Sequence, residues 1–198
     1  MAKLYFKYGA MGSSKTAQAL ITKFNYEERG MKVLLLKPAL DNREDKAVVR
    51  SRIGLEAPCL MVPDDMDLYK LYMDHYTDRD VVIVDECQFL TEDQVDQLGN
   101  LVLDRDIPVL CFGLRTDFLT HLFSGSKRLL EIAESVSEIK SVCRCGAKAT
   151  VNARFDDNGN VVYRGAQILI GSNSRYEAMC RSCWLKRKKE QEEKGIIS

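Results

Sequence analysis

The stretch Gly9-Ala-Met-Gly-Ser-Ser-Lys-Thr16 stands between an apolar, strand-like segment and a helical pattern. It follows the P-loop pattern G-x4-G-K-[ST], with Ser14 at the position of the second glycine. Backbone N–H groups in such a loop form a nest for anions, and the helix N-terminus adds its positive dipole end. Lys15 would reach the β- and γ-phosphates, and the Thr16 hydroxyl would hold Mg²⁺. The stretch therefore predicts a strand–loop–helix unit that binds nucleotide phosphates.

Ser14 is a departure from the usual glycine. A Cβ at this position is free of strain only if φ is negative, and otherwise costs roughly 1 kcal/mol. The structure of the loop decides between the two.

A second chemical signature is the apolar run 81–84, which ends in Asp85 and Glu86. A buried strand that ends in two acids is typical of a Walker B strand. In that role Asp85 binds Mg²⁺ through a water beside the P-loop, and Glu86 takes a proton from an attacking oxygen. Phosphoryl transfer needs little covalent chemistry, so positioning and charge neutralisation supply most of the rate. The two signatures together predict a P-loop nucleotide phosphohydrolase or kinase, without deciding between them.

Strand and helix patterns alternate from residue 1 to about 135, with apolar runs for strands and helical periodicity between them. The expected strands are 4–8, 32–37, 81–84 and 108–112, and the expected helices are 15–29, 64–76 with Asp64 as N-cap, and 91–104 with a Thr91/Gln94 capping box. Continuous apolar strands that alternate with helices indicate a parallel sheet covered on both faces. We therefore expect an α/β fold of the P-loop NTPase, RecA-like class.

The composition excludes several classes of protein. Of 198 residues 45% are hydrophobic, and 29 Lys and Arg balance 29 Asp and Glu, so the formal net charge is zero. This balance argues against intrinsic disorder and against binding of nucleic acid by bulk positive charge. No apolar run approaches the ~20 residues needed to cross a bilayer, and Lys3 and Lys7 make the N-terminal segment unlike a signal peptide. We expect a cytoplasmic protein without a membrane or nucleic-acid partner.

Seven cysteines, an odd number, fit poorly with a fully paired disulfide framework. Four of them form two close pairs, Cys143 with Cys145 and Cys180 with Cys183. Four thiolates so arranged fit tetrahedral Zn²⁺ and leave no ligand position for water, so the metal would be structural. The alternative is four free thiols, but a small β-rich module would then lack enough core to hold itself together.

The pattern of the chain changes after about residue 140. Short strands are expected at 149–155, 161–163 and 167–170, around an Asp-Asp-Asn-Gly turn, and the charged run 186–194 is expected to be a solvated helix end. We therefore divide the chain into a nucleotide-binding domain (1–140), a β-rich zinc-binding domain (141–185) and a charged tail (186–198).

Five blocks of sequence resemble the type II, cytosolic-type thymidine kinases almost from end to end. They are GAMGSSKT (9–16), KPALDNR (37–43), DECQFL (85–90), GLRTDF (113–118) with Phe123, and the run from CRCG (143–146) through QILIGSNSRY (167–176) to CRSC (180–183). The blocks at 85–90 and 167–176 are far more specific than a Walker motif. The chain is therefore identified as a member of this family.

The resemblance implies transfer of the γ-phosphate of ATP to the 5′-hydroxyl of thymidine or deoxyuridine. It implies that Glu86 is the base and that Lys15, Asp41 and Arg43 act near the transferred phosphate. The residues expected around the nucleotide are Gly9, Ala10, Met11, Gly12, Ser13, Ser14, Lys15, Thr16, Asp85, Glu86, Cys87 and Gln88, with Thr16 and Asp85 for Mg²⁺.

The resemblance also implies a nucleoside pocket. Its apolar walls would be Phe89, Leu114, Phe118 and Phe123; the lasso loop Gln167, Ile168, Leu169, Ile170 and Gly171 would contact the pyrimidine through main-chain groups, with Tyr176 nearby. Aromatic walls and a few placed hydrogen bonds suit a flat base. From the residues alone, Phe118 and Phe123 would instead be interpreted as core.

Three further points follow from the resemblance. Ser14 and Ser172 each replace a family glycine, and neither change removes a catalytic group. The family implies a homotetramer and feedback inhibition by dTTP at the substrate site. It also implies that the structural zinc ties the lasso domain together.

Two other functions compete with this interpretation. One is a P-loop ATPase whose zinc module holds nucleic acid or a protein through the basic cluster 186–189; zero net charge and the lasso block argue against it. The other is a non-catalytic nucleotide sensor, suggested by Ser14. Nucleoside-dependent formation of ADP would separate the three.

Overall fold

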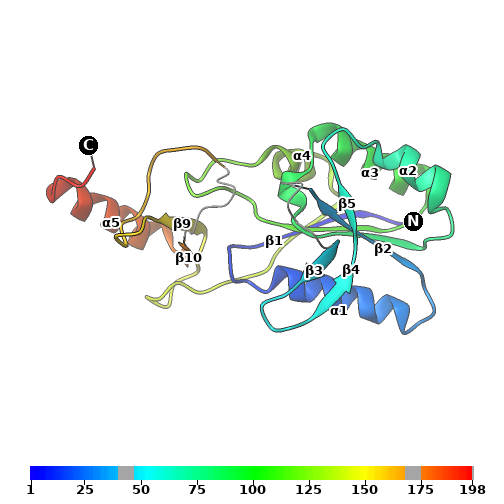
Figure 1. The fold of residues 1–198 in the computed structure, drawn as a ribbon, viewed down its shortest axis with the longest axis horizontal. Coiled ribbons are helices and arrows are strands. Elements are labelled where there is room, and N and C mark those ends of the chain that lie inside the picture. Colours follow the sequence, from blue (N-terminus) through cyan, green and yellow to red (C-terminus); the bar gives the residue numbers. More distant parts are fainter. Residues whose placement is uncertain (40–46, 168–174, 198) are drawn as a thin grey trace.

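The computed structural model describes residues 1–39, 47–167 and 175–197. Its larger part is a sheet of six parallel strands in the order β5-β2-β6-β7-β1-β8 (Figure 1). The strands are β1 (Leu4–Tyr8), β2 (Val33–Pro38), β5 (Leu60–Val62), β6 (Val81–Val84), β7 (Val109–Gly113) and β8 (Ser135–Glu138). The four strands expected from the sequence are therefore confirmed, and β5 and β8 are additions.

Helices cover both faces of this sheet, as the apolar strands predicted (Figure 1). Helix α1 (Lys15–Glu27) lies on one face and shares a core with alternate strand residues such as Val33 and Leu35. Helices α2 (Leu68–His75), α3 (Glu92–Arg105) and α4 (Ser124–Ile132) lie on the other face, against Leu34 and Leu36. Because successive strand side chains point to opposite faces, one strand supplies both cores.

The helix starts follow the capping signals only in part. The Thr91 side chain accepts from Gln94 N, and the Gln94 side chain accepts from Thr91 N, so the expected capping box is present. The expected cap of α2 was wrong, because Asp67 and not Asp64 accepts from Lys70 N at the helix start. Gln94 of α3 also donates to the carbonyls of Pro63, Asp64 and Met66, which holds that segment outside the helix.

Short elements lie beside the sheet. An antiparallel hairpin pairs β3 (Val48–Arg50) with β4 (Glu56–Pro58), and a 3-10 turn, η1 (Cys87–Phe89), follows β6. Neither was expected from the sequence. Both lie at the end of the sheet where its parallel strands finish, which is where ligands bind in open α/β sheets.

The C-terminal part has a small hydrophobic core of its own. Strand β9 (Val151–Phe155) pairs antiparallel with β10 (Arg175–Met179), and helix α5 (Arg181–Glu193) follows at the end of the molecule (Figure 1). The core residues include Cys143, Ala153, Phe155 and Cys180. The expected strand at 149–155 is confirmed for its main part, whereas 161–163 forms only one bridge, between Val161 and Phe155. Of the expected strand 167–170, Gln167 is not in a strand and the rest lies outside the described residues.

The charged run at 186–194 is not wholly a solvated helix end. Most of it is exposed within α5, but the Gln191 side chain is buried, where it accepts from Val161 N and donates to Val161 O. This part of α5 therefore packs on the β-rich core.

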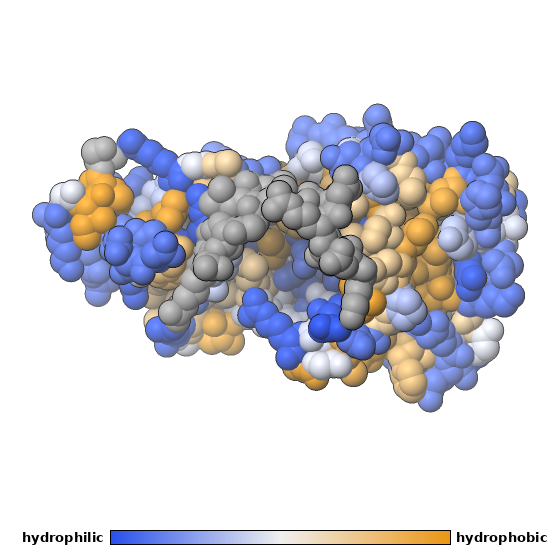
Figure 2. Space-filling model, viewed as in Figure 1, coloured by the Kyte–Doolittle hydropathy of each residue, from blue (hydrophilic) through white to orange (hydrophobic). Residues whose placement is uncertain are grey.

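The surface of the face seen in Figure 1 is mixed. Hydrophilic residues follow the outer edge formed by α2 and α3, and hydrophobic ones gather nearer the middle of the sheet-bearing part (Figure 2). Among the described residues, no helix is both long and apolar enough to span a bilayer.

Candidate active site

The P-loop connects β1 to α1 with two left-handed residues. Gly12 has a φ of 75° and Ser14 a φ of 62°, and the Ser14 side chain makes no capping hydrogen bond. The Ser14 carbonyl accepts from Gln18 N at 2.9 Å, the first hydrogen bond of the helix. A Cβ in this region costs about 1 kcal/mol. Ser14 is therefore strained, as expected for a non-glycine residue with positive φ.

Lys15 lies buried beneath the loop. Its Nζ donates to Ala10 O at 2.9 Å and to Ser13 Oγ at 3.4 Å. Burial lowers the pKa of Lys15, and the negative charges of Glu86 and Asp85 partly oppose this shift. A buried ammonium next to two acids at a helix N-terminus is suited to phosphate oxygens.

Thr16 meets the first acid of the Walker B strand. Its Oγ1 donates to Asp85 Oδ1 at 3.3 Å. Burial raises the pKa of Asp85 to about 7, with a further contribution from the nearby Glu86. A hydroxyl and a carboxylate side by side are oxygen ligands of the kind that Mg²⁺ prefers. The donor set at this point therefore fits the ion.

Glu86 is held by its neighbour Gln88. Gln88 is buried, its Nε2 donates to Glu86 Oε2, and its Oε1 accepts from Leu114 N at 2.9 Å. Gly113 leaves room for this arrangement, because a Cβ there would lie 2.5 Å from Gln88 Oε1. One glutamine thus fixes the acid after β6 relative to the chain after β7.

A cavity of about 390 Å³ opens over the P-loop. Its lining includes Lys15, Thr16, Glu86 and Leu114. It also includes Arg50 and Arg52, which sequence reasoning missed. The R-S-R spacing was the available signal, but only the β3–β4 hairpin brings these arginines opposite the P-loop. The Cys87 side chain is fully buried in the core and does not line this cavity.

The expected nucleoside residues come from η1, from the chain after β7 and from β10. Phe89 and Phe123 pack edge to face with ring centroids 5.4 Å apart. Leu114, Phe118 and Phe123 are buried, and Ser126 Oγ donates to Leu114 O. Tyr176, on β10, lines a neighbouring cavity of about 340 Å³ together with Met11 and Gly12.

The C-terminal part reaches this region through Asn152. Its Oδ1 accepts from Met11 N at 2.8 Å, and its Nδ2 donates to Thr116 O at 2.7 Å. Gln167, the first residue of the expected lasso, donates from Nε2 to Asp117 Oδ2 at 3.0 Å. Asn152 belongs to no sequence motif, so the sequence could not single it out.

Several expected site residues lie outside the described residues: Asp41, Arg43, Ile168, Leu169, Ile170, Gly171 and Ser172.

The two cysteine pairs come together as expected. The sulfur atoms of Cys143, Cys145, Cys180 and Cys183 all lie within 4.8 Å of one another, and Cys145 Sγ is 3.7 Å from Cys180 Sγ. Four sulfurs bound to one zinc at about 2.3 Å would be about 3.8 Å apart. The cluster therefore fits a tetrahedral zinc.

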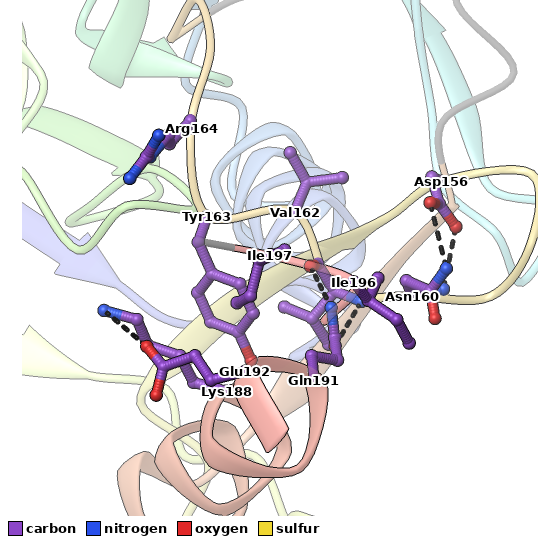
Figure 3. A pocket seen from close by; sticks show the side chains of 11 residues that line it. Asp156, Asn160, Val162, Tyr163, Arg164, Lys188, Gln191, Glu192, Ile196 and Ile197 are labelled. Carbon is purple, nitrogen blue, oxygen red and sulfur yellow. Dashed lines mark hydrogen bonds and ion pairs between the residues drawn. The ribbon is translucent and has the colours of Figure 1, made fainter. Parts of the chain in front are cut away.

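Another cavity, of about 370 Å³, lies between the 156–164 segment and the end of α5 (Figure 3). Its polar side chains bond to one another or to nearby backbone: Asn160 to Asp156, Lys188 to Glu192, and Gln191 to Val161. It contains none of the expected site residues and stands apart from the P-loop.

A parallel sheet with a P-loop after β1, two acids after β6 and a cavity over both defines an α/β P-loop nucleotide-binding protein. A family model described as thymidine kinase matches residues 2–184. The chain therefore belongs to the thymidine kinase family and is a kinase.

Several relatives are similar over nearly the full length. A thymidine kinase of Zymomonas mobilis is 47% identical over 183 residues, which cover 91% of this chain and 95% of that protein. A thymidine kinase of Enterobacteria phage T4 is 46% identical, covering 93% and 96% of the two chains. One of Vibrio vulnificus is 45% identical, covering 91% and 95%.

Proposed function

We propose that the protein transfers the γ-phosphate of ATP to the 5′-hydroxyl of thymidine, and of deoxyuridine, giving the nucleoside monophosphate and ADP. The observation that supports this most is the Gln88 bridge between Glu86 and Leu114. It joins the acid beside the P-loop to the loop that carries the aromatic residues. In this proposal Gln88 therefore holds the base next to both the phosphate site and the apolar nucleoside pocket.

In this proposal the P-loop holds the triphosphate of ATP. The backbone N–H groups of residues 9–16 and the buried Lys15 bind phosphate oxygens. Thr16 and Asp85 would hold Mg²⁺, which when bound neutralises charge on the phosphates. Arg50 and Arg52, on the opposite wall of the cavity, add positive charge. Family membership supports ATP as the donor.

Glu86 would act as the general base. Its carboxylate accepts the proton of the 5′-hydroxyl while that oxygen forms a bond to the γ-phosphorus and the bond from phosphorus to the β-phosphate oxygen breaks. Gln88 donates to Glu86 Oε2 and so orients the carboxylate. Asp41 and Arg43 are proposed, from the family resemblance alone, to act near the transferred phosphate.

The nucleoside would bind among Phe89, Leu114, Phe118 and Phe123. The lasso 167–171 and Tyr176 complete the proposed pocket. We also propose that dTTP binds where the substrates bind and acts as a feedback inhibitor.

The cysteine cluster would hold a structural zinc and tie down a lasso domain. We propose that the chain divides into a nucleotide-binding domain (1–140), a zinc-binding domain (141–185) and a tail (186–198), and α5 crosses the last boundary.

We also propose a cytoplasmic homotetramer. Exposed apolar residues on α1, Ile21 and Phe24, are compatible with such an assembly, and light scattering would measure its mass.

The decisive experiment measures ADP release from Mg-ATP with and without thymidine. Adenosine, deoxycytidine and single-stranded DNA serve as parallel acceptors or effectors. Thymidine-dependent turnover with thymidine monophosphate as product is expected. Turnover that responds to DNA instead would favour the ATPase, and binding of ATP without any turnover would favour the sensor.

A further inference from the structure

Arg154 of β9 is a buried arginine with unusual partners. Arg154 is only 3% exposed, and its guanidinium carbon lies 3.6 Å from the centroid of the Phe118 ring. Its Nη1 donates to Ala166 O at 3.1 Å, and its Nη2 lies 3.4 Å from the accepting Arg164 O. Among the described residues it forms no ion pair with a carboxylate.

A buried charge without a carboxylate is costly, because the guanidinium loses its hydration. Here an aromatic face and two carbonyl dipoles replace the water. Only the planar guanidinium can stack on a ring and donate along its edge at the same time. Lysine, a compact point charge, cannot do both.

The chain makes room for this arrangement at Gly165. Gly165 has a φ of 125°, and a Cβ there would lie 2.8 Å from Arg154 Nη2. The glycine therefore serves two needs at once, the backbone conformation and the close approach of the guanidinium.

The two partners of Arg154 belong to different parts of the molecule. Phe118 lies in the loop after β7, within the proposed nucleoside pocket, and 164–166 leads into Gln167, which bonds to Asp117 of that same loop. Asn152, two residues before Arg154 on β9, bonds both to Met11 of the P-loop and to Thr116 of the loop after β7. Asn152 therefore links the two loops, whereas the hydrogen bonds and the ring contact of Arg154 lie on the nucleoside side alone.

We propose that Arg154 is a positioning residue for the nucleoside: it fixes the Phe118 ring against the 164–166 backbone and thereby sets nucleoside affinity without affecting ATP. This rests on the proposed function. Within the described part of the chain, no hydrogen bond or ring contact of Arg154 reaches the P-loop. Loss of its guanidinium is therefore expected to change the KM for the nucleoside and to leave that for ATP unchanged.

The first test compares Arg154→Lys with Arg187→Lys. Arg187 also lies over a phenylalanine of the same module, Phe155, with 5.8 Å to the ring centroid, but it is exposed. Arg154→Lys is expected to raise the KM for thymidine about tenfold or more, with kcat and the KM for ATP within about twofold of wild type. Arg187→Lys is expected to leave all three unchanged.

The second test acts from the other side of the contact and avoids changing a buried residue. Gly165→Ala is compared with Gly159→Ala, another glycine with positive φ in the same module, whose Cβ would meet nothing within 4 Å. Both positions have positive φ, 125° at Gly165 and 80° at Gly159, so both variants carry backbone strain and Gly165→Ala carries more. Only Gly165→Ala would also displace the guanidinium. A rise in the KM for thymidine in Gly165→Ala alone is the expected result.

The possible outcomes distinguish failure of the proposed function from failure of the role of Arg154. If wild type shows no thymidine-dependent ADP release, the proposed function fails. If wild type is active but Arg154→Lys keeps its KM for thymidine, or raises the KM for ATP equally, the positioning role is wrong. If Arg154→Lys fails to fold, as judged by its melting temperature, the glycine pair decides: equal KM values for thymidine in Gly165→Ala and Gly159→Ala overturn the proposal.

Discussion

Thr16 at the start of α1 donates a hydrogen bond to Asp85 at the end of β6, two residues 69 positions apart in the chain. The strand order explains this contact, because β7 alone separates β1 from β6 and all three strands run parallel. Their carboxyl ends therefore meet at one edge of the sheet. The contact brings a hydroxyl and a buried carboxylate together, and we propose that these two groups hold the Mg²⁺ of the nucleotide.

Removing the Thr16 hydroxyl tests this contact. Thr16→Val keeps the shape of the side chain but loses the oxygen, and we expect kcat/KM for Mg-ATP to fall roughly tenfold or more. Thr16→Ser retains the hydroxyl and should stay near wild type. Equal kinetics in the two variants, measured over a series of Mg²⁺ concentrations, would contradict a role in holding the ion.

Removing the proposed base should affect the chemical step alone. Glu86→Gln keeps the shape and the hydrogen-bonding capacity, and we expect kcat to fall roughly 10²–10⁴-fold. Binding of ATP, measured by calorimetry, should remain nearly unchanged. Turnover at the wild-type rate would exclude Glu86 as the base.

Ser14 offers a test of backbone strain. With φ at 62°, Ser14→Gly should gain about 1 kcal/mol by relieving the Cβ contact. For a chain of this size that gain corresponds to a rise of roughly 2–4 °C in Tm. Ser14→Ala keeps the strain, and since the serine side chain makes no capping bond, its Tm should match that of wild type.

The space beside Gln88 can be tested at Gly113. A Cβ there would lie 2.5 Å from Gln88 Oε1 and 2.7 Å from Cys87 Sγ. Gly113→Ala should therefore lower the free energy of unfolding by roughly 1–3 kcal/mol and reduce kcat by disturbing Glu86. Gly99→Ala, within α3, meets only Ile132 Cδ1 at 3.4 Å and should stabilise the protein by about 0.5–1 kcal/mol. Similar urea midpoints for the two variants would be inconsistent with close packing around Gly113.

The cysteine cluster should carry one zinc per chain, measurable by elemental analysis. Cys145→Ser is expected to lose the metal and to lower the Tm, because the small core around the cluster then lacks its central link. Cys59→Ser, outside the cluster, should retain the zinc. Full zinc content in Cys145→Ser would rule out the four-cysteine site.

The sequence predicts structure best where the signal is local. The Thr91/Gln94 capping box, the P-loop between strand and helix, and the apolar run before Asp85 depend on neighbours within a few residues. The sequence did not predict α4, whose N-cap residue Phe123 provides no capping side chain, or β8, a largely polar strand at the sheet edge. Propensity gives no signal at such places, and packing against the sheet determines the structure.

The sequence by itself determined the class of fold, the phosphate-binding loop, the two acids and the cysteine pairs, because hydrogen bonds and periodicity within short segments specify them. Only the tertiary structure decided that Arg52 faces the P-loop, that Gln88 links Glu86 to Leu114, and that Arg154 stacks on Phe118. These relationships join residues from different strands and loops. Their partners are set by strand order and by the pairing of β9 with β10, which no local pattern in the chain encodes.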